Sequence, residues 1–212
     1  MNAAEARMRE AMAVHGRSLF ERGFCPGSSG NLSVRTEDGW LVSPTNSCLG
    51  RLDPVRIARL DADGRHVGGD PPSKEAFLHL AVYRERPSAG AVVHLHSTFA
   101  VALACLEDTD PVNALPPLTP YAVMKLGRVA VVPYHRPGDR ALADAVAQFA
   151  RGHCALLLAN HGPVVAGTDL EAAVFAAEEL EEAAKLAVLL RKERVRLLSE
   201  THVAAIREVF PS

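Results

Sequence analysis

Hydrophobic and polar positions follow two periods along this chain, and these predict interleaved helices and strands. Apolar residues spaced three or four apart, typical of helices, occur at 3–22, 76–86, 99–106, 140–150, 171–191 and 199–209. Short apolar or alternating runs, typical of strands, occur at 32–35, 39–43, 89–96, 129–133, 155–159 and 164–167, and within 52–60 after one turn of helix. Helices interleaved with hairpins indicate a three-layer α/β/α fold around a mixed, largely antiparallel central sheet. No repeat or low-complexity linker interrupts the pattern, so we expect a single domain over residues 1–212.

The strand predicted at residues 89–96 carries two histidines two positions apart. Side chains alternate across a strand, so His94 and His96 project from the same face. Two imidazoles in this arrangement can hold one divalent ion together with ligands from elsewhere in the chain. The same pattern also fits two histidines packed in a core, and the short motif alone does not separate these interpretations.

A third histidine, His161, follows the apolar run at 155–159 and precedes a glycine. A side chain at such a strand end reaches toward a site rather than into a core. Together with His94 and His96 it gives three imidazoles at strand ends, the arrangement with an open position that catalytic zinc uses. The chain has nine histidines, and the remaining six fit helical faces or turns: His15, His66, His79, His135, His153 and His202.

Two polar loops at predicted strand ends offer groups that suit an anion. Residues 25–35 form a glycine and serine loop, whose backbone amides can approach a ligand closely and whose serine and asparagine side chains add short polar arms. Residues 44–47 place a second set of hydroxyl and amide groups at the end of the next strand. Both stretches also fit plain tight turns.

The start of the helix at 76–86 has two interpretations. Ser73 fits the N-cap position, and Glu75 fits the first turn, where the helix dipole favours a carboxylate. Alternatively, the free amides of the helix start bind an anion with Ser73 and Lys74, while Glu75 points into a site as a base or ligand. Because this helix leads straight into the strand at 89–96, Glu75 and the two histidines belong to adjacent elements.

Composition and charge exclude several classes of protein. The chain has 212 residues, a net charge of -2 and no block of basic residues, which argues against a nucleic-acid partner or an anionic membrane surface. No apolar run approaches the roughly 20 residues that span a bilayer, and the N-terminus lacks the apolar core of a signal peptide. Four widely spaced cysteines fit reduced thiols. We therefore expect a cytoplasmic protein that does not bind a membrane.

Five motifs together resemble the class II aldolase and adducin family, which contains fuculose-phosphate aldolase and ribulose-phosphate epimerase. They are Gly30-Asn31-Leu32-Ser33, Ser43-Pro44-Thr45, Ser73-Lys74-Glu75, His94-Leu95-His96-Ser97 and Ala159-Asn160-His161-Gly162. Their order and spacing extend the similarity from about residue 3 to residue 190, and the resemblance implies the fold of that family. The segment 118–139 is most similar to the 3-oxo-tetronate 4-phosphate decarboxylase branch.

The resemblance implies one zinc ion per subunit, or another divalent metal, held by His94, His96 and His161. Glu75 would then be a displaceable fourth ligand and proton acceptor. The positions that match the family's phosphate-binding residues are Asn31, Thr45, Asn46, Ser73 and Lys74. Lys74 stands where the family usually has a second serine, and a cation there suits a doubly anionic substrate.

Tyr121 matches a tyrosine that, in the aldolases, enters a neighbouring subunit's site and moves a proton. It also fits a packed aromatic residue in a proline-rich loop. The resemblance further implies a homotetramer with active sites at the subunit interfaces.

The implied reaction is zinc-dependent decarboxylation of a 3-oxo-tetronate 4-phosphate to dihydroxyacetone phosphate and carbon dioxide through a metal-stabilised enediolate. A class II aldolase that cleaves a sugar phosphate of the fuculose or ribulose type forms the same kind of enediolate by losing an aldehyde. The metal and phosphate residues therefore do not separate the two activities. A non-catalytic module of the adducin type is a third possibility, against which the intact histidine set argues.

Overall fold

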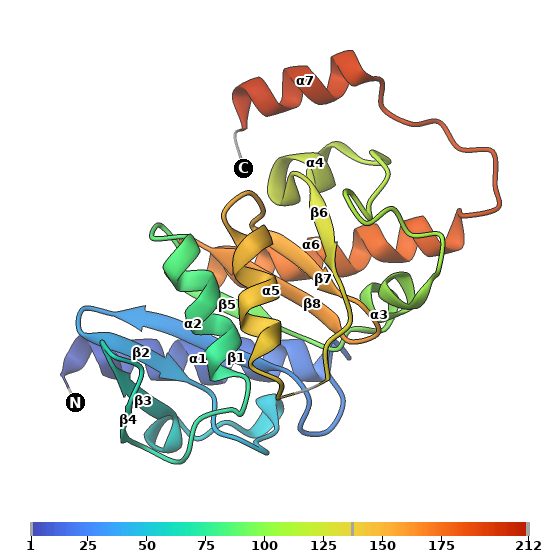
Figure 1. The fold of residues 1–212 in the computed structure, drawn as a ribbon. Coiled ribbons are helices and arrows are strands. Elements are labelled where there is room, and N and C mark those ends of the chain that lie inside the picture. Colours follow the sequence, from blue (N-terminus) through green and yellow to red (C-terminus); the bar gives the residue numbers. More distant parts are fainter. Residues whose placement is uncertain (1, 137, 211–212) are drawn as a thin grey trace.

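An eight-stranded sheet forms the centre of the computed structural model, with its strands in the order β4-β3-β2-β1-β5-β8-β7-β6 (Figure 1). The strands are β1 (Asn31–Thr36), β2 (Gly39–Val42), β3 (Ala58–Asp61), β4 (His66–Gly68), β5 (Ala91–His94), β6 (Val129–Val132), β7 (Ala155–Leu158) and β8 (Gly162–Gly167). Neighbouring strands are antiparallel, apart from the parallel pair β6 and β7. The structure describes residues 2–136 and 138–210, so Pro137 in the decarboxylase-like segment and both ends of the predicted 1–212 domain lie outside the described residues.

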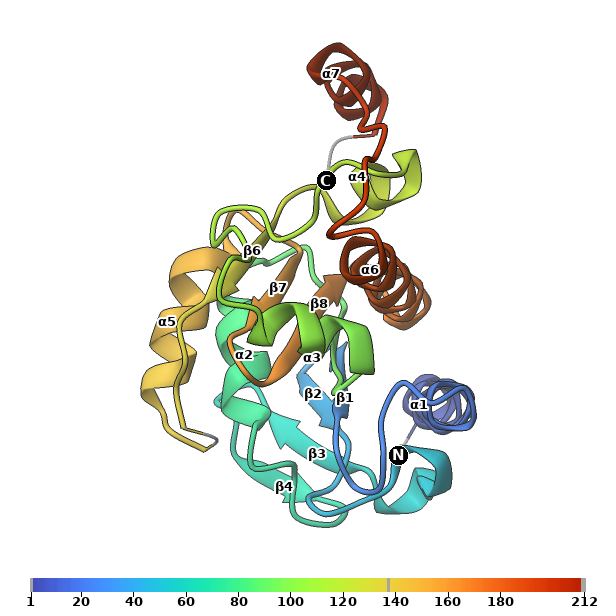
Figure 2. The same cartoon turned by 90° about the vertical axis from the view of Figure 1, so that its right-hand side faces the viewer.

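Helices cover both faces of this sheet. They are α1 (Ala3–Glu21), α2 (Ala76–Glu85), α3 (Thr98–Cys105), α4 (Pro120–Leu126), α5 (Ala141–Ala150), α6 (Leu170–Leu189) and α7 (Glu200–Val209), with short 3-10 turns at Leu49–Arg51 and Pro54–Arg56. Helices α2 and α5 pack together on one face, whereas α1, α3 and α6 cover the other (Figure 1, Figure 2). The predicted three-layer α/β/α fold with a mixed, largely antiparallel sheet is therefore confirmed.

Strand β5 separates the two hydrophobic cores. Val93 packs in the core beneath α1, α3 and α6, and Val92 packs in the core beneath α2 and α5. Because side chains alternate, His94 faces the same side as Val92, toward α2. The four residues of this strand are all buried, as expected for a central strand with helices on both sides.

The predicted strand at 89–96 is shorter in the structure, because β5 ends at His94. Regular pairing ends there: Asn31, opposite His94, is the first residue of β1, and on the other side the amide of Leu95 still donates to Pro163 at 3.2 Å, but Pro163 has no N–H group to donate in return. His96 therefore lies in the loop before α3, so the predicted end of the strand is wrong, whereas the side chains of His94 and His96 do come together, with their Nε2 atoms 3.2 Å apart.

The length and polarity of the helices also bear on membrane association. None of the helices in the described part of the chain is long and apolar enough to cross a lipid bilayer.

Candidate metal centre

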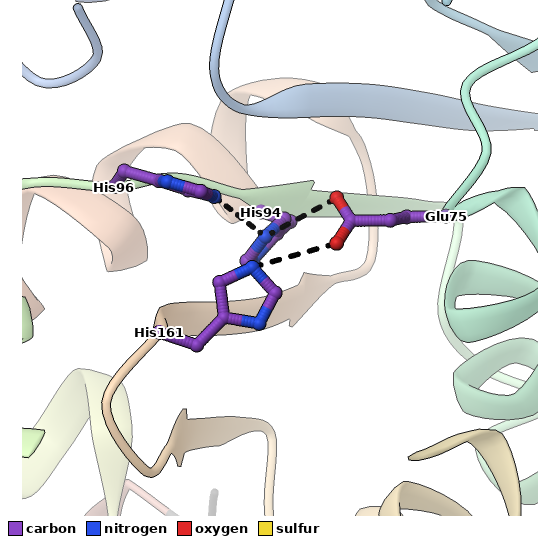
Figure 3. A group of neighbouring side chains, drawn as sticks. All are labelled: Glu75, His94, His96 and His161. Atoms are coloured by element: carbon purple, nitrogen blue, oxygen red, sulfur yellow. Dashed lines mark hydrogen bonds and ion pairs between the residues drawn. The ribbon is translucent and has the colours of Figure 1, made fainter. Parts of the chain in front are cut away.

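Four predicted site residues converge at the end of β5 (Figure 3). One ligand atom each from Glu75, His94, His96 and His161 lies within 4.8 Å of the other three. The Nε2 atoms of His94 and His96 are 3.2 Å apart. The two carboxylate oxygens of Glu75 lie 3.5 Å from Nε2 of His94 and 3.4 Å from Nε2 of His161. The cluster thus joins the start of α2, the end of β5 and the turn between β7 and β8.

Three of these separations are close to those expected between ligands of one tetrahedral ion, and all four ligand atoms lie within 4.8 Å of one another. Zinc–nitrogen bonds of about 2.0–2.1 Å at tetrahedral angles would place neighbouring ligand atoms roughly 3.3–3.4 Å apart. The observed separations of 3.2, 3.4 and 3.5 Å lie close to that value. Imidazole nitrogen and carboxylate oxygen are ligands that zinc prefers, and they also accept other divalent metals. The residues present therefore fit a divalent cation.

The backbone fixes the orientation of the His94 ring. Its Nδ1 donates a hydrogen bond to the carbonyl oxygen of Pro163 at 2.8 Å, so the lone pair of the neutral ring lies on Nε2 and faces the cluster. His94 is fully buried, and burial lowers its pKa to about 3. Burial also lowers the pKa of His96. Both rings are neutral near pH 7, which is the form that binds a metal.

His161 reaches the cluster because the turn after β7 comes very close to the end of β5. Asn160 adopts a φ of 56°, and the amide of His161 donates to the carbonyl of Leu158 at 3.0 Å to close the turn. A Cβ atom on Gly162 would lie 2.3 Å from the carbonyl oxygen of Leu95, which is closer than side chains tolerate. Glycine at this position therefore allows the approach that brings His161 to His94.

Glu75 occupies the N-cap position of α2, one residue before the helix begins. Its side chain makes no capping hydrogen bond and turns toward the histidines instead. The hydroxyl of Ser73 accepts a hydrogen bond from the amide of Glu75 at 3.2 Å. The prediction of Ser73 as the N-cap residue is wrong, and so is the prediction of Glu75 in the first helical turn. Helix α2 begins only at Ala76, and Glu75 is its N-cap residue.

Glu75 is held in its ionised form. Burial raises its pKa, but the neighbouring His94 ring and a hydrogen bond from Nδ2 of Asn31 at 2.8 Å outweigh burial, so that the pKa lies below its usual value. Only 15% of the side chain is exposed. The site therefore contains a sheltered carboxylate beside three imidazoles.

Four residues predicted to bind phosphate lie on two backbone segments that pair before α2 begins. An isolated antiparallel bridge joins Pro44 to Pro72, so that Thr45 lies opposite Pro71 and Ser43 lies opposite Ser73. Hydrogen bonds at 2.9 and 3.0 Å between the two backbones hold this pairing. Thr45 and Asn46 thus lie on one side of the bridge and Ser73 and Lys74 on the other, with Lys74 exposed to solvent.

A surface pocket of about 440 Å³ opens beside residues 45–46. Its polar lining includes Ser28, Thr45, Asn46, Ser47 and Arg51, together with Asp53, Arg56 and Asp70. Arg51 was not predicted as a site residue, because no motif marks it in the sequence. The hydroxyl, amide and arginine side chains suit an anionic ligand, whereas the two carboxylates disfavour one, although Asp70 is paired with Arg56 at 2.6 Å.

Asn31, the other residue predicted to bind phosphate, lies between the side chains of Glu75 and His79. It is 5% exposed. Its Nδ2 donates to Glu75, and its Oδ1 accepts a hydrogen bond from Nε2 of His79 at 2.5 Å. The sequence pattern predicted His79 only on a helical face. Its spacing of four residues from Glu75 nevertheless places both side chains on one side of α2.

Tyr121 stands apart from the cluster within this chain. It lies in the first turn of α4 and is 59% exposed. Helix α4 packs against α6 and α7 and precedes the start of β6. His161 follows the end of β7, which is parallel to β6, so Tyr121 and His161 belong to opposite ends of this strand pair. Its predicted place in a neighbouring subunit's site stays a prediction.

Comparison with known proteins gives a consistent group of relatives. Residues 10–188 match the family model described as the Class II Aldolase and Adducin N-terminal domain. The chain is 50% identical over 204 residues to a 3-oxo-tetronate 4-phosphate decarboxylase of Escherichia coli O6:H1 (strain CFT073), covering 96% of each chain. It is 34% identical over 192 residues to the L-fuculose phosphate aldolase of Escherichia coli K12, covering 89% of this chain and 86% of the aldolase.

Two solved structures extend the comparison to the fold. YgbL from Escherichia coli, described as an aldolase, epimerase or decarboxylase, matches with a TM-score of 0.94 and 47% identity over 96% of this chain and 99% of YgbL. An L-fuculose 1-phosphate aldolase matches with a TM-score of 0.87 and 29% identity, covering 97% of each chain.

Proposed function

Because this chain belongs to the class II aldolase and adducin family, we propose that it is a metal-dependent carbon–carbon lyase that decarboxylates a 3-oxo-tetronate 4-phosphate. The products are dihydroxyacetone phosphate and carbon dioxide. The observation that carries this assignment is the 50% identity to a decarboxylase of that name, which extends over 96% of both chains. The predicted family and its decarboxylase branch are confirmed by the same relatives.

The chemistry of the substrate defines what the site must do. The carboxylate is separated from the ketone by one hydroxyl-bearing carbon, so breaking the bond between that carbon and the carboxylate releases carbon dioxide. The electron pair left behind is conjugated with the ketone, and the same carbon then takes up one proton. An enzyme for this reaction binds two anionic groups, stabilises charge on the ketone oxygen and delivers a proton.

Zinc is the proposed metal, one ion per subunit, and His94, His96 and His161 are its proposed ligands. Glu75 is the proposed fourth, displaceable ligand. Zinc bound there would supply a Lewis acid that stabilises the enediolate formed as carbon dioxide leaves. The convergence of the four side chains, whose ligand atoms lie within 4.8 Å of one another, and the neutral state of His94 support this role.

Glu75 and Tyr121 are the two proposed proton-transfer groups. Glu75 is an ionised, sheltered carboxylate that can accept a proton from a substrate hydroxyl or return one to the reacting carbon. Tyr121 is exposed on α4 and would act in the site of a neighbouring subunit. That arrangement requires an oligomer with sites at subunit interfaces, and a homotetramer is part of this proposal.

The pocket beside residues 45–46 is the proposed place for the phosphate. Thr45 and Asn46 line it together with Arg51, whereas Ser73, opposite Ser43 across the bridge, does not line it. Lys74 adds an exposed cation for one of the two anionic groups of the substrate. Asn31 keeps one Nδ2 hydrogen that Glu75 does not use, so it can still donate to a substrate oxygen.

An aldolase is the second candidate, favoured by the 34% identity to L-fuculose phosphate aldolase. The zinc-loaded protein is incubated separately with a 3-oxo-tetronate 4-phosphate and with fuculose 1-phosphate, and carbon dioxide, dihydroxyacetone phosphate and aldehyde are measured. We expect carbon dioxide and dihydroxyacetone phosphate from the first substrate only, and loss of both after treatment with a chelator. Release of aldehyde without carbon dioxide would make the aldolase the better assignment.

The adducin-like alternative and the cellular location complete the proposal. A non-catalytic module predicts protein without a bound metal, so zinc analysis of freshly purified protein separates it from either enzyme. We propose a cytoplasmic location, because all four cysteines, which lie in the described part of the chain, are free thiols, as is usual in a reducing compartment.

A further inference from the structure

A continuous chain of polar side chains runs from Glu75 into the core beneath α2. Nδ2 of Asn31 donates to the Glu75 carboxylate at 2.8 Å, and Oδ1 of Asn31 lies 2.5 Å from Nε2 of His79. Nδ1 of His79 lies 2.7 Å from the hydroxyl of Ser33, which lies 2.9 Å from the hydroxyl of Tyr83. Five side chains thus connect the candidate metal centre with the middle of the molecule.

Helix α2 and strand β1 supply these polar side chains from faces that meet. Glu75, His79 and Tyr83 are spaced by four residues along α2, and Asn31 and Ser33 are spaced by two along β1. The side chains beyond Glu75 are at most 5% exposed. The polar chain therefore crosses an apolar layer, where each of its groups needs a partner.

The position of each hydrogen at the outer end follows from its neighbour. The Glu75 carboxylate only accepts hydrogen bonds, so the amide nitrogen of Asn31 faces it and Oδ1 faces His79. Because Oδ1 also only accepts, His79 carries its hydrogen on Nε2. Hydrogen bonds are therefore donated in one direction, from the His79 ring to Asn31 and from Asn31 to the Glu75 carboxylate.

The inner end is fixed in the same way. Burial lowers the pKa of His79 to about 4, so the ring is neutral and its Nδ1 accepts from the Ser33 hydroxyl. Burial raises the pKa of Tyr83, which keeps its hydroxyl protonated and able to donate to Ser33. With all five groups partnered in a single direction, the chain holds each ring and amide in one orientation.

We propose that His79 is a positioning residue: supported by Ser33 and Tyr83, it fixes the amide of Asn31 so that this amide orients the Glu75 carboxylate toward the three histidines. A partner behind a metal-site residue commonly changes metal affinity or activity by about 10–100-fold. The inference rests on the proposed function only for the role of Glu75 in the reaction. Metal binding tests it independently of the substrate.

The test compares three variants with the full-length wild-type protein. His79→Leu removes both ring nitrogens, whereas His79→Gln keeps an amide donor near the position of Nε2. Leu78→Ala is the matched control, because Leu78 is a fully buried neighbour in the same apolar layer whose aliphatic side chain makes no hydrogen bond within the polar chain. Zinc affinity is measured by competition with a chromophoric chelator, kcat and KM by release of carbon dioxide, and stability by urea unfolding.

We expect His79→Leu to lower zinc affinity and kcat by about 10–100-fold with little change in KM. His79→Gln should keep both within about threefold of wild type, on the same scale of outer-partner effects. Leu78→Ala should lose stability while keeping zinc affinity. Unchanged zinc affinity in His79→Leu, or an equal loss in Leu78→Ala, would overturn the proposal.

A further variant, Ser33→Ala, tests the proposal if His79→Leu does not fold. Ser33→Ala leaves the ring in place but removes the hydroxyl that holds its Nδ1, so a smaller loss of roughly three- to tenfold in zinc affinity is expected. A Ser33→Ala protein with wild-type zinc affinity and kcat would contradict the inference. A wild-type protein that binds zinc but releases no carbon dioxide would refute the proposed function alone, and the affinity comparison would still stand.

Discussion

Two fully buried histidines in this protein use their ring nitrogens differently. His94 gives its Nδ1 hydrogen to a backbone carbonyl and keeps the Nε2 lone pair for the cluster, whereas His79 uses both nitrogens inside the polar chain. Burial holds both rings neutral and lowers the pKa of His79 to about 4. In an unfolded chain a histidine has a pKa of about 6.5. Folding is therefore linked to proton release below that pH.

This linkage predicts that acid destabilises the protein partly through His79. The pKa of the folded state is lower than that of the unfolded state, so the stabilisation is complete above about pH 6.5 and is lost as the pH falls toward 4. One such group contributes a slope of up to about 1.4 kcal/mol per pH unit in that window. Urea unfolding of the wild type and of His79→Gln, with chelator present, should show a slope shallower by roughly 1 kcal/mol per pH unit in the variant.

The comparison between the two proteins isolates His79. His94 and His96 titrate in both proteins, so their contribution to the slope cancels in the difference. Equal slopes in wild type and variant between pH 6.5 and pH 4 would show that the ring is not held neutral by burial.

The helices and strands that carry the site were predicted largely from hydrophobic periodicity. Its limits show at β5, where the apolar run continues through Leu95 although the strand ends at His94. Strand ends depend on what the neighbouring strands offer, here Pro163 and the start of β1, and this is not visible in the local pattern. Helix α4 was not predicted either, because its seven residues follow a proline-rich segment and are too few to show a period.

The site shows the same division between local and non-local information. The motifs predicted which residues meet, and the structure brings Glu75 and the three histidines within 4.8 Å, although their role as metal ligands stays a prediction. The contacts of Asn31 and His79 were not predicted, since their hydrogen bonds join a strand to a helix more than forty positions away in the sequence. Motif spacing reports chemistry, whereas such orientation depends on packing.

At the turn between β7 and β8, a single glycine controls how close two elements come. Gly162→Ala would place a Cβ 2.3 Å from the carbonyl oxygen of Leu95 and push the His161 turn away from β5. We expect a loss of about 1–3 kcal/mol in the free energy of unfolding, as for other overpacked sites. We also expect zinc affinity to fall by about tenfold or more, because a ligand moves out of reach.

The control for this substitution is Gly152→Ala at the turn after α5. A Cβ there would meet nothing nearer than 4.0 Å. Both variants are assayed by urea unfolding and by zinc competition. A Gly162→Ala protein with the stability and zinc affinity of Gly152→Ala would show that this close approach does not position His161.

At the scale of the whole molecule, one end of the chain exposes apolar surface. Helix α7 projects as an arm beyond α4, and none of its residues is buried (Figure 1, Figure 2). Val209 is 67% exposed, and Tyr121 on α4 is 59% exposed. A projecting helix with exposed apolar residues is suited to packing against another subunit. This supports the proposed homotetramer, in which α4 and α7 would lie against other subunits.

The tetramer proposal predicts complementation between two inactive variants. If each active site combines Glu75 of one subunit with Tyr121 of its neighbour, Tyr121→Phe and Glu75→Gln inactivate different halves of the same site. Mixing the two proteins under conditions that exchange subunits then recreates intact sites at interfaces where wild-type halves meet. Random assembly from equal amounts restores on the order of a quarter of wild-type carbon dioxide release, provided that the contact is between symmetry-related subunits. Native mass spectrometry confirms exchange, and mixed tetramers without activity would place both proton-transfer groups in one subunit or remove Tyr121 from the reaction.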